Sequence, residues 1–123
     1  MIRILVIDDD VLFRQVIAEY LTSAGYEVSQ ADNGLSGINL FRTDPTDLVI
    51  IDIIMPEQEG MGTIIELRKD FPDVKIIAIS GGAQAGGVDY LGFATKLGAV
   101  GALAKPFGEE QLLAAVREAL GEE

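Results

Sequence analysis

Short runs of apolar, mostly β-branched residues alternate along the chain with longer segments in which apolar residues recur at helical spacing. The short runs predict buried strands, and the longer segments predict amphipathic helices that pack against them. The predicted strands are 2–7, 27–31, 48–51, 75–79 and 100–104.

A helix is predicted after each of these strands. The first spans Val11 to Ala24, where Phe13, Ile17 and Leu21 share one face and Gly25 is placed to end the helix. The other helices are predicted after the Asn33-Gly34 turn, between Pro56 and Pro72, ending near Gly98, and around Leu112 to Leu120. This order predicts an α/β fold, a doubly wound five-stranded parallel sheet with helices on both faces, in one domain covering residues 1–123.

Composition narrows the possible functions. Nine basic and twenty acidic residues give a net charge of -11, which disfavours direct contact with nucleic acid or anionic membranes. The chain has no cysteine and no histidine, which excludes thiol chemistry, a Ser-His-Asp triad and an internal phosphohistidine. No apolar run approaches the roughly 20 residues of a membrane span, and the N-terminus lacks a signal-peptide pattern, so we expect a cytoplasmic protein.

Polar residues follow four of the five predicted strands directly. Asp8 and Asp9 follow the first strand, Asp52 the third, Ser80 the fourth and Lys105 the fifth. Ligands of open parallel sheets bind at the carboxyl ends of the strands, so all five side chains are expected to converge there.

Each of these residues also has a structural explanation on its own. The aspartates at 8–10 could form a solvated loop or a helix N-cap, Ser80 could be a turn residue, and Lys105 could be a surface charge. A carboxylate at Asp52, between apolar residues, would lose solvation with no structural gain. The joint placement at equivalent strand ends favours a functional site.

Three carboxylates so close together would repel one another unless a cation lies among them. Mg²⁺ suits such oxygen ligands and characteristically joins carboxylates to phosphate oxygens. The residues therefore predict that Asp52 is a nucleophile that accepts a phosphoryl group. Asp8 and Asp9 would hold the metal, Lys105 would stabilise the phosphoryl oxygens and Ser80 would donate a hydrogen bond to them.

Four motifs carry a resemblance to a known family: Ile4 to Asp10, Asp52 to Pro56 with Gly60, Ser80, and Lys105-Pro106-Phe107. With them the chain resembles the receiver domains of bacterial two-component response regulators. The resemblance implies a flavodoxin-like sheet of order 2-1-3-4-5 and phosphorylation of Asp52 by a sensor histidine kinase or a histidine phosphotransfer protein. It also implies Mg²⁺ bound by Asp8, Asp9, Asp52 and the backbone carbonyl of Ile54, slow self-dephosphorylation, and a cis peptide before Pro106.

Three positions depart from the family pattern. Ala102 stands where many members have an aromatic switch residue, so the output is expected to use another movable element. The glycine-rich segment 81–87 is the second departure, since it looks longer and more flexible than is common after the fourth strand. We expect this segment, with the fourth helix and beside the strand at 100–104, to be the movable element. Ile54 is bulky and apolar, and we expect it to hinder the attacking water and lengthen the phosphorylated lifetime.

The leading hypothesis is a stand-alone receiver of the chemotaxis or phosphorelay type, a phosphoacceptor with intrinsic phosphorylation and dephosphorylation chemistry that signals to an unidentified downstream protein. One alternative is a receiver excised from a longer regulator. Another is a phosphatase with Asp8 as nucleophile and Asp10 as general acid. A flavin-binding domain is disfavoured, because the first strand leads into carboxylates rather than into a phosphate-binding loop.

Overall fold

A computed structural model of the chain describes residues 1–55, 59–81 and 90–122. It contains a five-stranded parallel sheet of order β2-β1-β3-β4-β5, which confirms the predicted fold. The strands are β1 (Arg3–Ile7), β2 (Glu27–Ala31), β3 (Leu48–Asp52), β4 (Ile76–Ser80) and β5 (Gly101–Ala104).

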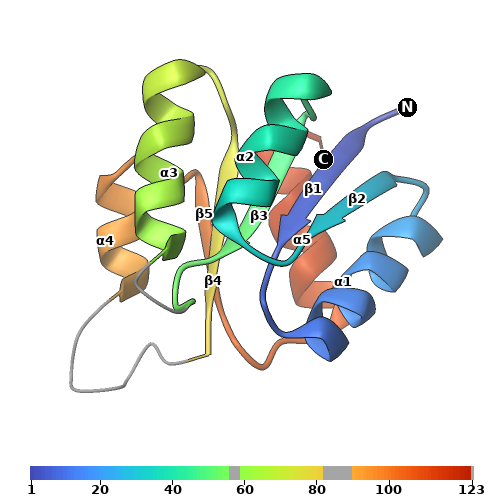
Figure 1. Cartoon of the computed structure of the whole chain (residues 1–123). Helices are drawn as coiled ribbons and strands as arrows, with labels where there is room; N and C mark the ends of the chain where they lie inside the picture. Colours follow the sequence, from blue (N-terminus) through green and yellow to red (C-terminus); the bar gives the residue numbers. More distant parts are fainter. Residues whose placement is uncertain (56–58, 82–89, 123) are drawn as a thin grey trace.

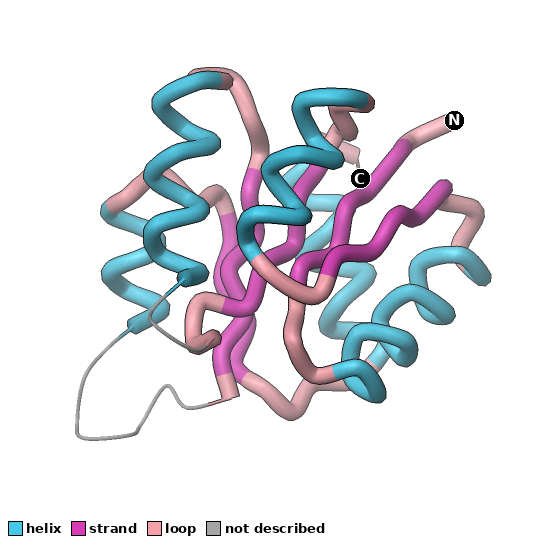
Figure 2. The backbone as a smooth tube through the Cα atoms, viewed as in Figure 1, coloured by secondary structure: helices cyan, strands magenta, loops and turns pink. Residues whose placement is uncertain are grey.

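Helices cover both faces of the sheet (Figures 1 and 2). The helices are α1 (Val11–Ser23), α2 (Gly34–Thr43), α3 (Glu59–Asp70), α4 (Tyr90–Lys96) and α5 (Glu109–Leu120). One apolar cluster joins α1 and α5 to one face of the sheet, and a second joins α2, α3 and α4 to the other. The sheet is thus the middle layer of three.

Burial along the strands follows their position in the sheet. Every residue of β3 and β4 is buried, as expected of central strands with helices above and below them. The edge strand β5 instead alternates between half-buried and exposed residues. The carboxyl ends of the two central strands β3 and β4 therefore extend from an apolar core.

Local sequence signals define the helix ends. Asp10 caps α1 by accepting a hydrogen bond from the Phe13 amide at 3.1 Å, and Asn33 caps α2 by accepting one from the Ser36 amide at 2.8 Å. Gly25 follows the end of α1 with a φ of 98°, a conformation that favours glycine. The predicted role of Gly25 as helix stop is confirmed.

Three strands begin one residue later than predicted, at Arg3, Ile76 and Gly101. The residues before them still bond to the neighbouring strand through the backbone. The carbonyl of Lys75 accepts from the Val49 amide at 2.9 Å, and the Val100 amide donates to the Ile76 carbonyl at 2.8 Å.

None of the described helices is long and apolar enough to cross a bilayer.

Candidate functional site

The five predicted site residues lie at the carboxyl edge of the sheet. Asp52 and Ser80 are the last residues of β3 and β4, Asp8 and Asp9 follow β1, and Lys105 follows β5. This edge is the lower one in the view of Figure 1. The parallel register fixes the arrangement, since it pairs Asp52 with Ile79 and Ser80 with Ala104.

Three carboxylates form the centre of the site. Asp8, Asp9 and Asp52 each offer one oxygen, and these oxygens lie within 4.8 Å of one another. Asp8 is fully buried and Asp52 is 4% exposed, whereas Asp9 is exposed. The cluster is therefore open to solvent on the side of Asp9 and closed by the sheet behind it.

Lys105 supplies the positive charge of the site. Its Nζ atom lies 2.8 Å from Asp52 Oδ2, to which it donates a hydrogen bond, and 2.9 Å from Asp8 Oδ2. Burial alone would lower the pKa of Lys105, but the contacts with Asp52 and Asp8 outweigh burial and raise the pKa above its ordinary value of 10.5. The lysine is therefore a cation at any physiological pH.

Asp8 carries the least favourable charge of the site. Burial raises the pKa of its carboxyl above 3.8, and the nearby Asp52 adds to the increase, although a hydrogen bond from the Asp10 amide and the charge of Lys105 oppose it. The Asp10 amide donates to Asp8 Oδ1 at 2.9 Å. Asp8 Oδ2 has only the ion pair with Lys105 and no aligned hydrogen bond among the described residues.

Ser80 and Ile54 occupy the margins of the site. Ser80 is fully buried, and its Oγ atom has no hydrogen-bond partner among the residues that the structure describes. The Ile54 amide donates to Asp52 Oδ1 at 2.8 Å, and the Ile54 side chain is 37% exposed. Asp52 is thus oriented from both sides, by Ile54 at one oxygen and by Lys105 at the other.

Two glycines allow close packing at the site: Gly60 against the backbone of Asp52 and Ile53, and Gly81 against the side chain of Lys105. A Cβ atom on Gly60 would lie 2.4 Å from the Asp52 carbonyl oxygen and 2.4 Å from Ile53 Cα. A Cβ atom on Gly81 would lie 3.2 Å from Cδ of Lys105. The first turn of α3 therefore supports the backbone of Asp52, and Gly81 leaves room for the stem of the lysine.

Two residues that contact the site, Arg14 and Phe13, were not predicted as site residues from the sequence. Arg14 donates from Nη1 to the Asp8 carbonyl at 2.7 Å and from Nε to Gln30 Oε1 at 3.1 Å. Phe13, predicted only as a core-facing helix residue, has its ring beneath the Lys105 ammonium at 4.4 Å. Their positions in the first turns of a helix that starts at the acid cluster are the only sequence signal for either contact.

Some of the sequence predictions concern residues that the structure does not describe. Pro56 and most of the glycine-rich segment, including Gly82, Gly86 and Gly87, lie outside the described residues.

The Lys105–Pro106 peptide is cis, as the family resemblance implied. Ala102 is exposed on β5, opposite Ala78 in the sheet register.

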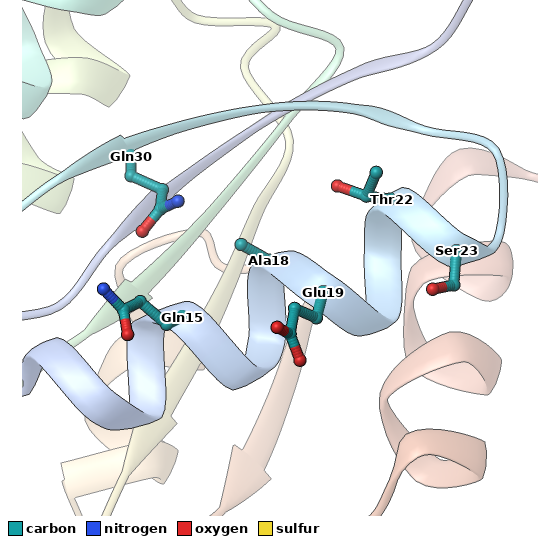
Figure 3. Close-up of a pocket in the computed structure, with 6 residues that line it drawn as sticks. All are labelled: Gln15, Ala18, Glu19, Thr22, Ser23 and Gln30. Atoms are coloured by element: carbon teal, nitrogen blue, oxygen red, sulfur yellow. The ribbon is translucent and has the colours of Figure 1, made fainter.

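A surface groove of about 550 Å³ lies between α1 and β2 (Figure 3). The sticks in the close-up show mostly amide, hydroxyl and carboxylate side chains along it. It is lined by Gln15, Ala18, Glu19, Thr22, Ser23 and Gln30, none of which belongs to the acid cluster. The groove is therefore separate from the acid cluster at the carboxyl edge of the sheet.

Residues 4–117 match the response regulator receiver domain family. The chain belongs to this family. The matched range spans Asp8, Asp9 and Asp52, so these three carboxylates lie within a receiver domain of two-component signalling and are consistent with its phosphoacceptor site.

Individual relatives of this receiver domain differ in length. The chemotaxis protein CheY of Thermotoga maritima is 35% identical over 118 residues, which cover 94% of this chain and 95% of that protein. The probable transcriptional regulatory protein SilR of Salmonella typhimurium is 36% identical over 118 residues, 96% of this chain but 50% of that protein. The chain thus spans about half the length of SilR and nearly the full length of the chemotaxis protein.

Solved structures agree with this assignment. A response regulator receiver domain protein from Clostridium thermocellum superposes with a TM-score of 0.88 and 32% identity, covering 98% of this chain and 95% of that one. A CheY-like receiver domain protein from Methanospirillum hungatei gives a TM-score of 0.89 at 28% identity.

The donor set of this receiver domain fits a divalent cation. Three carboxylate oxygens within 4.8 Å face one ammonium, which leaves an excess of negative charge. Asp8 Oδ2 is a buried oxygen without an aligned donor, the condition that a metal ion relieves. Oxygen-only ligands that are partly open to solvent suit Mg²⁺, which keeps several of its waters.

Proposed function

We propose that this receiver domain, taken as residues 1–123, accepts a phosphoryl group on Asp52 and thereby controls the binding of a downstream protein. The observation that supports this most directly is the Lys105 ammonium, which bridges Asp52 and Asp8 at 2.8 and 2.9 Å beside the exposed Asp9. A nucleophile, cation ligands and a fixed positive charge thus share one open edge.

The reaction is a transfer between two nucleophiles. An oxygen of the Asp52 carboxylate forms a bond to phosphorus while the bond from phosphorus to the donor breaks. Lys105 stabilises the charge on the phosphoryl oxygens, and the Ser80 hydroxyl, which lacks a partner among the described residues, donates a hydrogen bond to one of them. Asp8, Asp9, Asp52 and the carbonyl of Ile54 would hold Mg²⁺, which neutralises carboxylate and phosphoryl charge when bound.

The phosphoryl donor lies outside these 123 residues. This chain contains no histidine, so a phosphohistidine must come from a sensor histidine kinase or a phosphotransfer protein. Receiver domains in general work with such kinases, and we expect the phosphohistidine to approach from the side of the exposed Asp9.

The surface of α4 and β5 would carry the output. Phe93 on α4 and Val100 before β5 are 58% and 54% exposed, and Ala102 on β5 is exposed as well. Because residue 102 is alanine, this chain lacks an aromatic side chain at that position to couple the site to the surface. Hydrogen exchange of residues 90–104 with and without beryllofluoride tests this, and unchanged protection would contradict it.

The phosphorylation itself is tested with acetyl phosphate and Mg²⁺, followed by intact mass and peptide mapping. The wild type is expected to gain one phosphoryl group on Asp52, and Asp52→Asn is expected to gain none. Asp73→Asn, an exposed aspartate at the opposite edge of the sheet, is the matched control. Labelling of Asp8 would instead support the phosphatase alternative, and an unlabelled wild type would refute both.

A further inference from the structure

The ring of Phe13 contacts the Lys105 ammonium, although it takes no part in the chemistry proposed above. Lys105 Nζ lies over the ring, 4.4 Å from its centroid. A cation at this distance from an aromatic face is attracted by the negative charge density of the ring. Because the Lys105 side chain is only 14% exposed, water screens this attraction less than it would at a free surface.

The ring is held on two sides. Its edge-to-face partner is Phe107, with ring centroids 5.3 Å apart and an angle of 86° between the planes. The Phe13 amide donates to the N-cap Asp10, and the Asp10 amide in turn donates to Asp8 Oδ1. Phe13 is therefore linked to the short segment that carries Asp8 and Asp9, and to the loop that carries Lys105.

Among the contacts that the described residues make with the ammonium, the ring is the one that the reaction leaves in place. The other two are Asp52 and Asp8, whose oxygens serve as phosphoacceptor and cation ligand on the proposed function. Phe13 has no such second task, and its face attracts the ammonium in the same way before and after these oxygens change partners. The stem of Lys105 is confined as well, since it passes close to Gly81.

We propose that Phe13 is a positioning residue for Lys105. The ring of Phe13 holds the Lys105 ammonium at the edge of the site while the carboxylates of Asp52 and Asp8 bind other groups. The inference rests on the proposed function, because it concerns the speed of transfer to Asp52. Preorganised charge accelerates a reaction only when it need not be rearranged during the reaction.

Two substitutions separate the aromatic face from simple packing. Phe13→Leu keeps an apolar side chain but removes the face, and Phe13→Tyr keeps the face. With acetyl phosphate at saturating concentration and Mg²⁺ present, we expect Phe13→Leu to be labelled about five- to tenfold more slowly, and Phe13→Tyr to stay within about twofold of the wild type. Phe13→Met is a second variant without the face, should Phe13→Leu lose its fold.

A spectroscopic measurement on the metal-free protein is independent of activity. We expect the ring current of Phe13 to shift the ε-methylene resonance of Lys105 upfield, and Lys105→Met identifies that resonance by its loss. We expect the upfield shift to disappear in Phe13→Leu and to persist in Phe13→Tyr. Phe71→Leu is the matched control, because Phe71 forms a similar edge-to-face pair with Phe41 but lies between the end of α3 and the amino end of β4.

The outcomes distinguish this inference from the function on which it rests. A wild type that acetyl phosphate does not label would overturn both proposals. A labelled wild type with an equally fast Phe13→Leu, an unchanged Lys105 resonance in that variant, or a Phe13→Tyr as slow as Phe13→Leu would overturn the positioning role alone. Slower labelling of Phe71→Leu would also overturn it, since the loss would then follow from weakened packing.

Discussion

Gly60 gives the sharpest test of how the fold positions Asp52. A Cβ atom at this position would lie 2.4 Å from the Asp52 carbonyl oxygen and from Ile53 Cα, and both of these are backbone atoms. Ordinary van der Waals contact begins at 3.4 Å, so Gly60→Ala requires the start of α3 and the end of β3 to separate by about 1 Å.

Two consequences follow from that displacement. Overpacking of this kind costs about 1–3 kcal/mol of unfolding free energy, measured from the midpoint of urea denaturation. A shift of about 1 Å in a reacting group can cost roughly 100-fold in rate, so labelling of Asp52 by acetyl phosphate is expected to slow by about 10- to 100-fold.

Gly62 provides a matched control on the same helix. A Cβ atom there meets no atom within 4 Å, so Gly62→Ala gains helix propensity without a clash. We expect Gly62→Ala to be more stable than the wild type by up to about 1 kcal/mol and to be labelled at the wild-type rate. If Gly60→Ala matched Gly62→Ala in both stability and labelling, α3 would not be supporting the phosphoacceptor backbone, and this reasoning would be refuted.

Three further variants test individual charges and side chains. Asp8→Asn should raise stability in Mg²⁺-free buffer by on the order of 1 kcal/mol at neutral pH. Because the folded pKa of Asp8 is raised, its ionisation destabilises the fold, so urea midpoints of variant and wild type should converge as pH falls through that pKa toward 3.8. Lys105→Met should slow labelling by about 100-fold and lower the urea midpoint, because two buried carboxylates lose their counter-charge; an unchanged rate would remove Lys105 from the mechanism. Ile54→Asn should shorten the phosphoryl lifetime by about three- to tenfold, measured from the decay of the labelled mass, and an unchanged lifetime would show that Ile54 does not hinder water.

The fold was predictable because the central strands are apolar on both faces. Leu48 to Ile51 and Ile76 to Ile79 leave no polar face for solvent, and that pattern requires helices above and below the sheet. Strand-end polar residues were equally informative, since parallel strands bring Asp8, Asp52 and Lys105 to one edge whatever their separation in the sequence. The strand order came from the family resemblance rather than from the periodicity.

The contacts of α1 with the site were not predictable in the same way. The helical spacing placed Phe13 on the core-facing side, and it does pack against the α1–α5 cluster. Whether its ring also reaches Lys105 depends on how α1 is rotated and tilted against the loop after β5, which no one-dimensional pattern records. The same holds for Arg14, whose bond to the Asp8 carbonyl, six residues earlier in the chain, depends on how α1 is oriented relative to the end of β1.

The unmodified site contains three features that each cost stability: a buried Asp8 with a raised pKa, three carboxylates facing one ammonium, and a buried Ser80 hydroxyl without a partner among the described residues. A ligand shifts a conformational equilibrium only as far as it binds the two states differently. On the proposed function, a cation relieves the excess negative charge, and a phosphoryl group gives the Ser80 hydroxyl an acceptor. The features that make the resting site costly are therefore the same ones through which phosphorylation can favour a second conformation of the chain.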